Sequence, residues 1–145
     1  KIKKVIEMYI KVPIVKRLKD CDLDIFIAAL KKKFNTSNRV YLDNNNPYIY
    51  NFNENLIDLC GLIDIIDCDK LLATIEIIDT PSGNIVSKIV DMCDNKKLDY
   101  EDIDIMYEDV IYVENLYLFP LCLEDHNRNK VDNIFISKFE LRYKK

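Results

Sequence analysis

Hydrophobic side chains occupy every second position near the start of the chain, in KIKKVIEMYIKVPIV (residues 1–15). The even-numbered positions from Ile6 to Val12 would lie on one face of a strand, because successive side chains of a strand point to opposite faces. Pro13 has no N–H to give to a neighbouring strand and therefore suits the end of such an element. The pattern predicts a first strand that ends near residue 13.

The hydrophobic spacing changes in DCDLDIFIAALKKKF, residues 20–34. Apolar residues now recur three or four positions apart, which places them on one stripe of a helix. The stripe consists of Leu23, Phe26, Ile27, Leu30 and Phe34. Asp20 or Asp22 can cap the start, and Lys31–Lys33 suit the negative end of the helix dipole. We expect an amphipathic helix over about residues 22–34.

A strand, a turn and a second helix follow one another in TIEIIDTPSGNIVSKIVDM, residues 74–92. Thr80 suits an N-cap, and Pro81 suits the first helical position, where a missing N–H costs nothing. The helical stripe consists of Ile85, Val86, Ile89, Val90 and Cys93. We expect a helix over about residues 81–95, entered from a strand through a capped turn.

The remaining patterns predict strands. Residues 55–79 indicate a hairpin with its turn near Cys68–Lys70, and residues 110–124 indicate one or two strands that reverse near Glu114–Asn115. Residues 44–47 and the polar segment EDHNRNKVD (residues 124–132) are expected to be loops. The last strand, NIFISKFELRYKK, alternates: its apolar face holds Phe135, Phe139, Leu141 and Tyr143, and its polar face holds Lys138, Glu140 and Arg142.

Length and composition predict one globular domain over residues 1–145. Of the 145 residues, 49% are hydrophobic and 32% are charged, which is typical of a folded chain with a single core. The predicted fold class is α+β: a mostly antiparallel sheet with two amphipathic helices packed on it.

The charge balance and the lack of long apolar runs make nucleic acids and membranes unfavourable partners. The formal net charge is −4, whereas proteins that neutralise several phosphates carry a basic surface, so nucleic-acid binding is not favoured. The basic groups at Lys31–Lys33 and Lys144–Lys145 suit a solvated helix end and a frayed terminus. No apolar run reaches the roughly 18 residues that cross a bilayer, and the N-terminus lacks a signal-peptide core. We predict an intracellular protein that does not bind membranes.

The five cysteines do not resemble a metal site. They are Cys21, Cys60, Cys68, Cys93 and Cys122, and no two of them form a CxxC pair. Zinc sites need closely spaced ligands, and the chain has a single histidine. Cys60 and Cys122 lie in apolar runs, where a thiol behaves as a small core side chain. The cysteines therefore indicate a reducing compartment.

The residue types that could act in catalysis are not arranged for it. A Ser–His or Cys–His mechanism needs a histidine that can take a proton, and His126 lies in a polar segment. Ser82 and Ser87 have no evident partner base, and Cys93 belongs to the stripe of a helix. The sequence therefore predicts no catalytic residue.

A group of acids between residues 99 and 109 could bind Mg²⁺ or Ca²⁺ through oxygen ligands. It consists of Asp99, Glu101, Asp102, Asp104, Glu108 and Asp109, without the spacing of an EF-hand. A solvated acidic edge that discourages strand-to-strand association is the favoured interpretation, and the same holds for Asp64, Asp67 and Asp69. A metal-dependent enzyme centred on residues 99–109 remains an alternative.

Two segments resemble known families. LCGLIDIID (residues 59–67) is similar to the LAGLIDADG signature of homing endonucleases, in which this segment is a helix, but the second glycine is missing here and the surroundings favour a strand. LLATIEIIDTPSGNIVSKIVD (residues 71–91) resembles the strand–turn–helix of tailed-phage prohead (capsid maturation) proteases. The second resemblance extends over residues 39–92.

The prohead-protease resemblance implies a relative without catalytic activity. In that family a histidine lies upstream of the segment, and a strand downstream of it carries the nucleophilic serine. Asn44 or Asn45 stands where the histidine belongs, and NKKLDYEDIDIMYED (residues 95–109) contains no serine. Asn cannot act as a general base near neutral pH. The fold would then be retained for packing or assembly.

These observations together predict a non-catalytic domain that needs no cofactor and binds a protein partner or itself. Heavy use of Ile, Asn, Lys, Asp and Tyr suggests an AT-rich genome, as in many viruses and parasites. In a virus, a domain that binds other proteins would suit a capsid, scaffold or host-interaction role. A nucleic-acid-associated factor that uses the basic helix end is a further alternative. If the C-terminal strand, residues 133–145, lies at a sheet edge, it is the first candidate for pairing with a partner strand.

Overall fold

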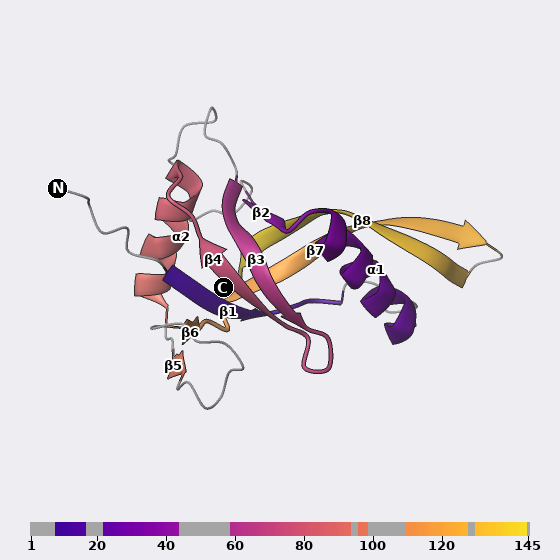
Figure 1. Cartoon of the computed structure of the whole chain (residues 1–145), viewed down its shortest axis with the longest axis horizontal. Coiled ribbons are helices and arrows are strands. Elements are labelled where there is room, and N and C mark those ends of the chain that lie inside the picture. Colours follow the sequence, from indigo (N-terminus) through magenta and orange to yellow (C-terminus); the bar gives the residue numbers. More distant parts are fainter. Residues whose placement is uncertain are drawn as a thin grey trace.

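The structure is a computed structural model that describes residues 8–16, 22–43, 59–93, 96–98, 110–127 and 130–144. Within these residues eight strands form one sheet in the order β5-β6-β1-β4-β3-β2-β8-β7, and two helices pack on it (Figure 1). The strands are β1 (Met8–Pro13), β2 (Arg39–Leu42), β3 (Leu59–Asp67), β4 (Leu72–Ile77), β5 (Lys96–Leu98), β6 (Val110–Tyr112), β7 (Leu116–Asn127) and β8 (Lys130–Tyr143). The helices are α1 (Leu23–Thr36) and α2 (Pro81–Met92). The α+β class is confirmed.

The sheet is mixed, so the prediction of a mostly antiparallel sheet holds only in part. Two of its seven pairings are parallel, β1 with β6 and β2 with β8, and the other five are antiparallel. Alternation along a strand reports which side chains are buried and carries no information on the direction of the neighbouring strand. The parallel pairings therefore could not be seen in the hydrophobic pattern.

The sheet curls until its two halves meet at β1. One edge of β1 pairs with β4, and the other pairs first with β6 and then, through a parallel bridge between Ile14 and Leu118, with β7. The N–H of Val15 donates to the carbonyl of Leu118 at 3.0 Å, and the N–H of Val113 donates to that of Lys11 at 3.0 Å. The strands β1, β4, β3, β2, β8 and β7 thus form a closed ring, to which β5 and β6 are attached.

Both β6 and β7 run parallel to β1, so the predicted reversal near Glu114–Asn115 was wrong. The chain bends at these two residues and then continues in the same direction along β1. A polar pair between apolar runs is compatible with a bend as well as with a hairpin turn.

The inside of the ring is filled with apolar side chains from facing strands. Directly paired and fully buried residues include Ile10 with Ile75, Val12 with Ala73, Val40 with Phe139, and Leu118 with Leu141. The buried apolar side chains of the strands and of both helices form one continuous cluster. Burial of this kind supplies most of the stabilisation of a small fold.

A bulge in β8 changes which side chains face the core. Leu121 pairs with Lys138 but Cys122 pairs with Ile136, so Ser137 is an extra residue, and its hydroxyl donates to the carbonyl of Leu121 at 3.0 Å. Ile134 and Ile136 are buried before the bulge and Phe139 and Leu141 after it, while Phe135 is 45% exposed. The prediction that Phe135 shares the face of Phe139 was therefore wrong, because a bulge reverses the alternation.

The β3–β4 hairpin has its turn at residues 68–71, as predicted. The carboxylate of Asp67 accepts the N–H groups of Asp69 and Lys70, each at 3.1 Å, and Leu71 has a positive φ of 52°. LCGLIDIID is β3 itself, so the segment that resembles a homing-endonuclease helix is a strand. EDHNRNKVD was expected to be a loop, but its described residues continue the β7 and β8 strands.

Both predicted helices are confirmed with small shifts of their ends. Asp22 caps α1 by accepting the N–H of Asp24 at 3.0 Å, and the helix buries Phe26, Ala29 and Leu30 against β8. The buried side of α1 is rotated from the predicted stripe, so Leu23 is 46% exposed. The second helix, α2, packs on β3 and β4 and ends at Met92 rather than near residue 95.

Thr80 holds the start of α2 as the sequence predicts. Its hydroxyl accepts the N–H of Gly83 at 3.0 Å and donates to the carbonyl of Leu59 at 2.6 Å, which ties the helix to β3. Pro81 occupies the first turn.

Because Thr80→Ala removes both bonds, we expect it to lower the free energy of unfolding by about 1–2 kcal/mol. Thr80→Ser keeps the hydroxyl and serves as the control, with a loss of less than about half of that. Urea unfolding followed by circular dichroism measures both variants. Equal losses for Ala and Ser would show that the hydroxyl bonds are not responsible.

Candidate interaction surface

The distal part of the β7–β8 hairpin lies outside the ring. The two strands remain paired as far as Asn127 and Lys130, whereas β1 reaches β7 at Leu118 and the β2 ladder covers only Phe139–Leu141 of β8. Figure 1 shows the hairpin extending away from the rest of the sheet, with α1 beside it. Within the described residues, the distal hairpin is therefore a two-stranded ribbon supported by one helix.

Two large apolar side chains are exposed on this ribbon. Leu123 is 61% exposed, Phe135 is 45% exposed, and the two residues pair directly across the strands. Single exposed apolar residues are normal on a protein surface. Two that face each other on a projecting hairpin form a small apolar patch of the kind that protein interfaces use.

A shallow pocket of about 140 Å³ lies next to this patch, between α1 and β8. It is lined by Ala29, Lys32, Lys33 and Thr36 of α1 and by Ile134, Phe135 and Ile136 of β8. The Lys32 ammonium lies 5.3 Å from the centre of the Phe135 ring, within the range of a cation–π contact. The floor is therefore apolar, and the rim on the α1 side is basic.

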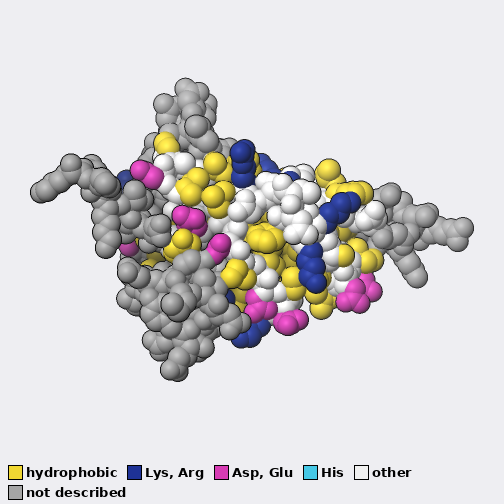
Figure 2. All heavy atoms as spheres, viewed as in Figure 1, with side chains coloured by type: hydrophobic (Ala, Val, Ile, Leu, Met, Phe, Trp, Pro, Cys, Tyr) yellow, Lys and Arg dark blue, Asp and Glu magenta, His cyan; other side chains and the backbone are white. Residues whose placement is uncertain are grey.

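The basic rim is a local exception in an acidic chain. None of the described residues that line the pocket is acidic, although the net charge of the chain is −4. The ion pairs among the described residues use Lys138 and Arg142 as their cations, and not the two lysines of the rim. Figure 2 shows basic side chains over α1 beside hydrophobic ones, at the end of the molecule from which the hairpin extends.

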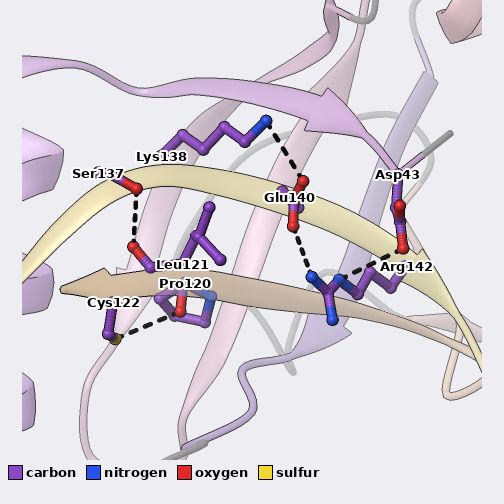
Figure 3. A network of polar contacts seen from close by, with 8 residues as sticks. All are labelled: Asp43, Pro120, Leu121, Cys122, Ser137, Lys138, Glu140 and Arg142. Carbon is purple, nitrogen blue, oxygen red and sulfur yellow. Dashed lines mark hydrogen bonds and ion pairs between the residues drawn. The ribbon is translucent and has the colours of Figure 1, made fainter. Parts of the chain in front are cut away.

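A network of charged side chains covers the outer face of β8 next to the pocket (Figure 3). Arg142 donates to Glu140 at 2.7 Å and pairs with Asp43 at 3.4 Å, and Lys138 lies 3.4 Å from Glu140. The guanidinium also stacks 3.6 Å from the ring centre of Phe119. Arg142 therefore has two carboxylate partners and one aromatic partner, and its Nε, which is buried without a hydrogen bond, has only the ion pair with Asp43.

The candidate nucleophiles have structural roles. Ser82 is 2% exposed, so it is closed to a substrate. The hydroxyl of Ser87 donates to the carbonyl of Gly83 at 3.2 Å and lies 3.7 Å from the sulfur of Met8. Cys93 is the C-cap of α2, and its N–H donates to the carbonyls of Ile89 and Val90. All three groups lie on α2 or at its end, whereas His126 belongs to β7.

The start of α2 leaves no room for a bound anion. The Thr80 hydroxyl occupies the N–H of Gly83, and the backbone carbonyls of Ile78 and Cys60 lie against Gly83. The strand–turn–helix over residues 74–92 is therefore a packed corner of the scaffold.

Other candidates from the sequence fall outside a common site or outside the described residues. Asp64, Asp67 and Asp69 lie at the β3–β4 hairpin, where Asp67 orders the turn. The acids at 99–109 and Asn44 and Asn45 lie outside the described residues, and His126 belongs to β7, although its side chain is not described. In the part of the chain that the structure describes, no three His, Cys, Asp or Glu residues come together as a metal site.

Sequence reasoning identifies the three lysines of α1 and Phe135 but does not bring them together. The pattern assigns the lysines to a solvated helix end and Phe135 to the core, since it implies a regular alternation along β8. A polar residue next to a run of large apolar ones, as at Ser137, is the only signal that could have indicated a bulge.

Comparisons with known proteins give no family for this chain: no family model, curated protein or solved structure matches it. None of the helices in the described ranges is long and apolar enough to cross a membrane.

Proposed function

We propose that this chain is a non-catalytic protein-interaction or assembly domain that works through the distal β7–β8 hairpin and α1. The observation that carries the proposal is the cross-strand pair of Leu123 and Phe135, exposed on a hairpin that projects beyond the ring. A small apolar patch with a charged border resembles the centre and rim of a protein interface.

The proposal includes an intracellular, viral setting in a capsid, scaffold or host-interaction role, and distant kinship with prohead proteases. The AT-rich coding that the composition suggests supports the viral setting. The kinship is supported by residues 72–92, which fold as a strand, a capped turn and a helix. The asparagines at 44 and 45 and the missing downstream serine are the reason to place the chain among relatives without protease activity.

Site-directed photo-crosslinking tests the interaction role, because it captures a bound protein whatever its identity. The photo-reactive p-benzoylphenylalanine is placed at position 135 in one variant and at position 92 in a matched control, in cells that produce the full chain. Met92 is 67% exposed and apolar but lies on α2, away from the hairpin. We expect discrete protein adducts from position 135 at no less than about five times the yield from position 92, in line with burial of the hairpin patch in an interface.

The same adducts should form when a cell lysate is irradiated after EDTA has removed its Mg²⁺, because the patch contains no metal ligand. Equal yields at the two positions, or no adducts at position 135, would contradict the proposal. Loss of the adducts in EDTA would favour the alternative of a metal-dependent protein that uses the acids at 99–109.

A further inference from the structure

In the part of the chain that the structure describes, no strand pairs with the edge of β8 beside α1 between Asn133 and Ser137. β2 begins at Arg39, and its ladder with β8 starts at the pair Val40–Phe139. Within the described residues the preceding part of β8 pairs with β7 alone. The backbone groups on its other edge can therefore accept a further strand, which would continue the ladder where β2 stops.

The pocket along this edge has the size of one apolar side chain. Its volume is about 140 Å³, and an apolar cavity of about 150 Å³ in another protein holds a benzene molecule. Ala29, Ile134 and Ile136 supply aliphatic walls, and Phe135 supplies an aromatic one. An extended segment sends every second side chain to the same face, so one leucine or phenylalanine of an added strand can enter the pocket.

The positive charge of the rim favours acidic segments as partners. Lys32 and Lys33 both line the pocket, and no carboxylate lies on its described lining. A partner segment with carboxylates on either side of its apolar residue would place them against these ammonium groups. The aliphatic walls and the negative net charge of the chain favour such a protein segment over a nucleic acid.

We propose that an extended, acidic segment of a partner protein adds as a strand to the Asn133–Ser137 edge of β8, alongside α1. One apolar side chain of the segment fills the pocket, and its flanking carboxylates pair with Lys32 and Lys33. This inference rests on the proposed function and specifies the chemistry of the partner.

The test uses the full chain and a fluorescein-labelled peptide of twelve residues, in which a single leucine is flanked on both sides by aspartates and glutamates. Fluorescence anisotropy measures its binding at low salt. Lys32→Glu and Lys33→Glu are expected to weaken binding at least tenfold each. The matched control is Lys31→Glu, an exposed neighbour that does not line the pocket, and it is expected to weaken binding less than threefold.

Two further measurements separate strand addition from attraction between charges. A peptide with serine in place of leucine should bind at least tenfold more weakly, because the pocket is then empty. Hydrogen–deuterium exchange should show the amides of residues 133–137 protected at least tenfold by the peptide, while those of α2 remain unchanged.

Equal losses for Lys31→Glu and Lys32→Glu, no effect of the leucine, or no binding at all would overturn the inference. Tighter binding of a twenty-nucleotide single-stranded DNA that displaces the peptide would also overturn it and favour a nucleic-acid partner. If position 135 gives protein adducts but the peptide does not bind, the proposed function stands and this choice of partner fails. If position 135 gives no adducts, the proposed function itself fails, whatever the peptide does.

Discussion

Phe139→Ala is expected to lower the free energy of unfolding by about 3–5 kcal/mol, whereas Phe135→Ala, four residues earlier in the same strand, is expected to cost less than about 1 kcal/mol. Phe139 is fully buried in the ring opposite Val40, and Phe135 is 45% exposed on the distal hairpin. Truncation of Phe139 leaves a cavity in the core, whereas truncation of Phe135 exposes a position that already contacts water.

The pair of variants is matched in residue type, strand and substitution, so the difference isolates the bulge at Ser137. Urea unfolding followed by tyrosine fluorescence and circular dichroism measures both, and equal slopes would show that the denatured states are comparable. Without a bulge, both phenylalanines would face the core and both variants would be destabilised severely. A similar loss of unfolding free energy in the two variants would therefore contradict the structure.

Gly83→Ala is the second substitution with a large expected effect. A Cβ at this position would overlap with the carbonyl oxygen of Ile78 and lie 3.2 Å from that of Cys60. Both obstacles are backbone atoms, and they are joined to each other because the N–H of Ile78 donates to the carbonyl of Cys60 at 3.1 Å. The helix would have to move away from β3, so we expect a loss of at least about 3 kcal/mol or failure to fold.

Asn84→Ala provides the control for this prediction. Asn84 is the next residue of α2 and is exposed, and its backbone N–H still donates to the carbonyl of Thr80 after the change. Its effect on the free energy of unfolding should stay within about 0.5 kcal/mol. Thermal unfolding of the two variants in parallel measures the contrast, and a Gly83→Ala protein as stable as Asn84→Ala would show that α2 does not pack this closely.

Local patterns in the sequence were sufficient for the two helices and for the β3–β4 turn. The spacing of apolar residues and the caps at Asp22 and Thr80 act within one or two turns of a helix, and so does the Asp67 turn in its hairpin. Such features depend on neighbours in the chain, so they can be predicted before the fold is known.

The features that could not be predicted depend on residues far apart in the sequence. The bridge between Ile14 and Leu118 closes the ring, and the parallel pairing of Val40 with Phe139 sets the neighbour of β8. The four residues of these two pairs are ordinary apolar strand residues, so nothing in the sequence marks them as partners. The candidate surface has the same origin, because the Lys32–Phe135 contact exists only after β8 is placed beside α1.

The pairing of β8 also decides whether truncation of the C-terminal strand can serve as a test of partner binding. The sequence offers residues 133–145 as a strand for pairing with a partner if they lie at a sheet edge, but β8 is paired with β7 along its length and with β2 at residues 139–141. Removal of residues 133–145 would open the ring and expose the core. A truncation therefore cannot distinguish loss of partner binding from loss of the fold.

The ring closure has a consequence for how the protein is made. Val40 pairs with a residue almost one hundred positions later, and the strand that accepts it is the last of the ring to leave the ribosome. Contacts between such distant residues slow folding, since the intervening chain must lose its freedom before the contact forms. During synthesis, β1 to β4 wait with unpaired edges and an uncovered apolar face, so this nascent chain has the features that holdase chaperones bind.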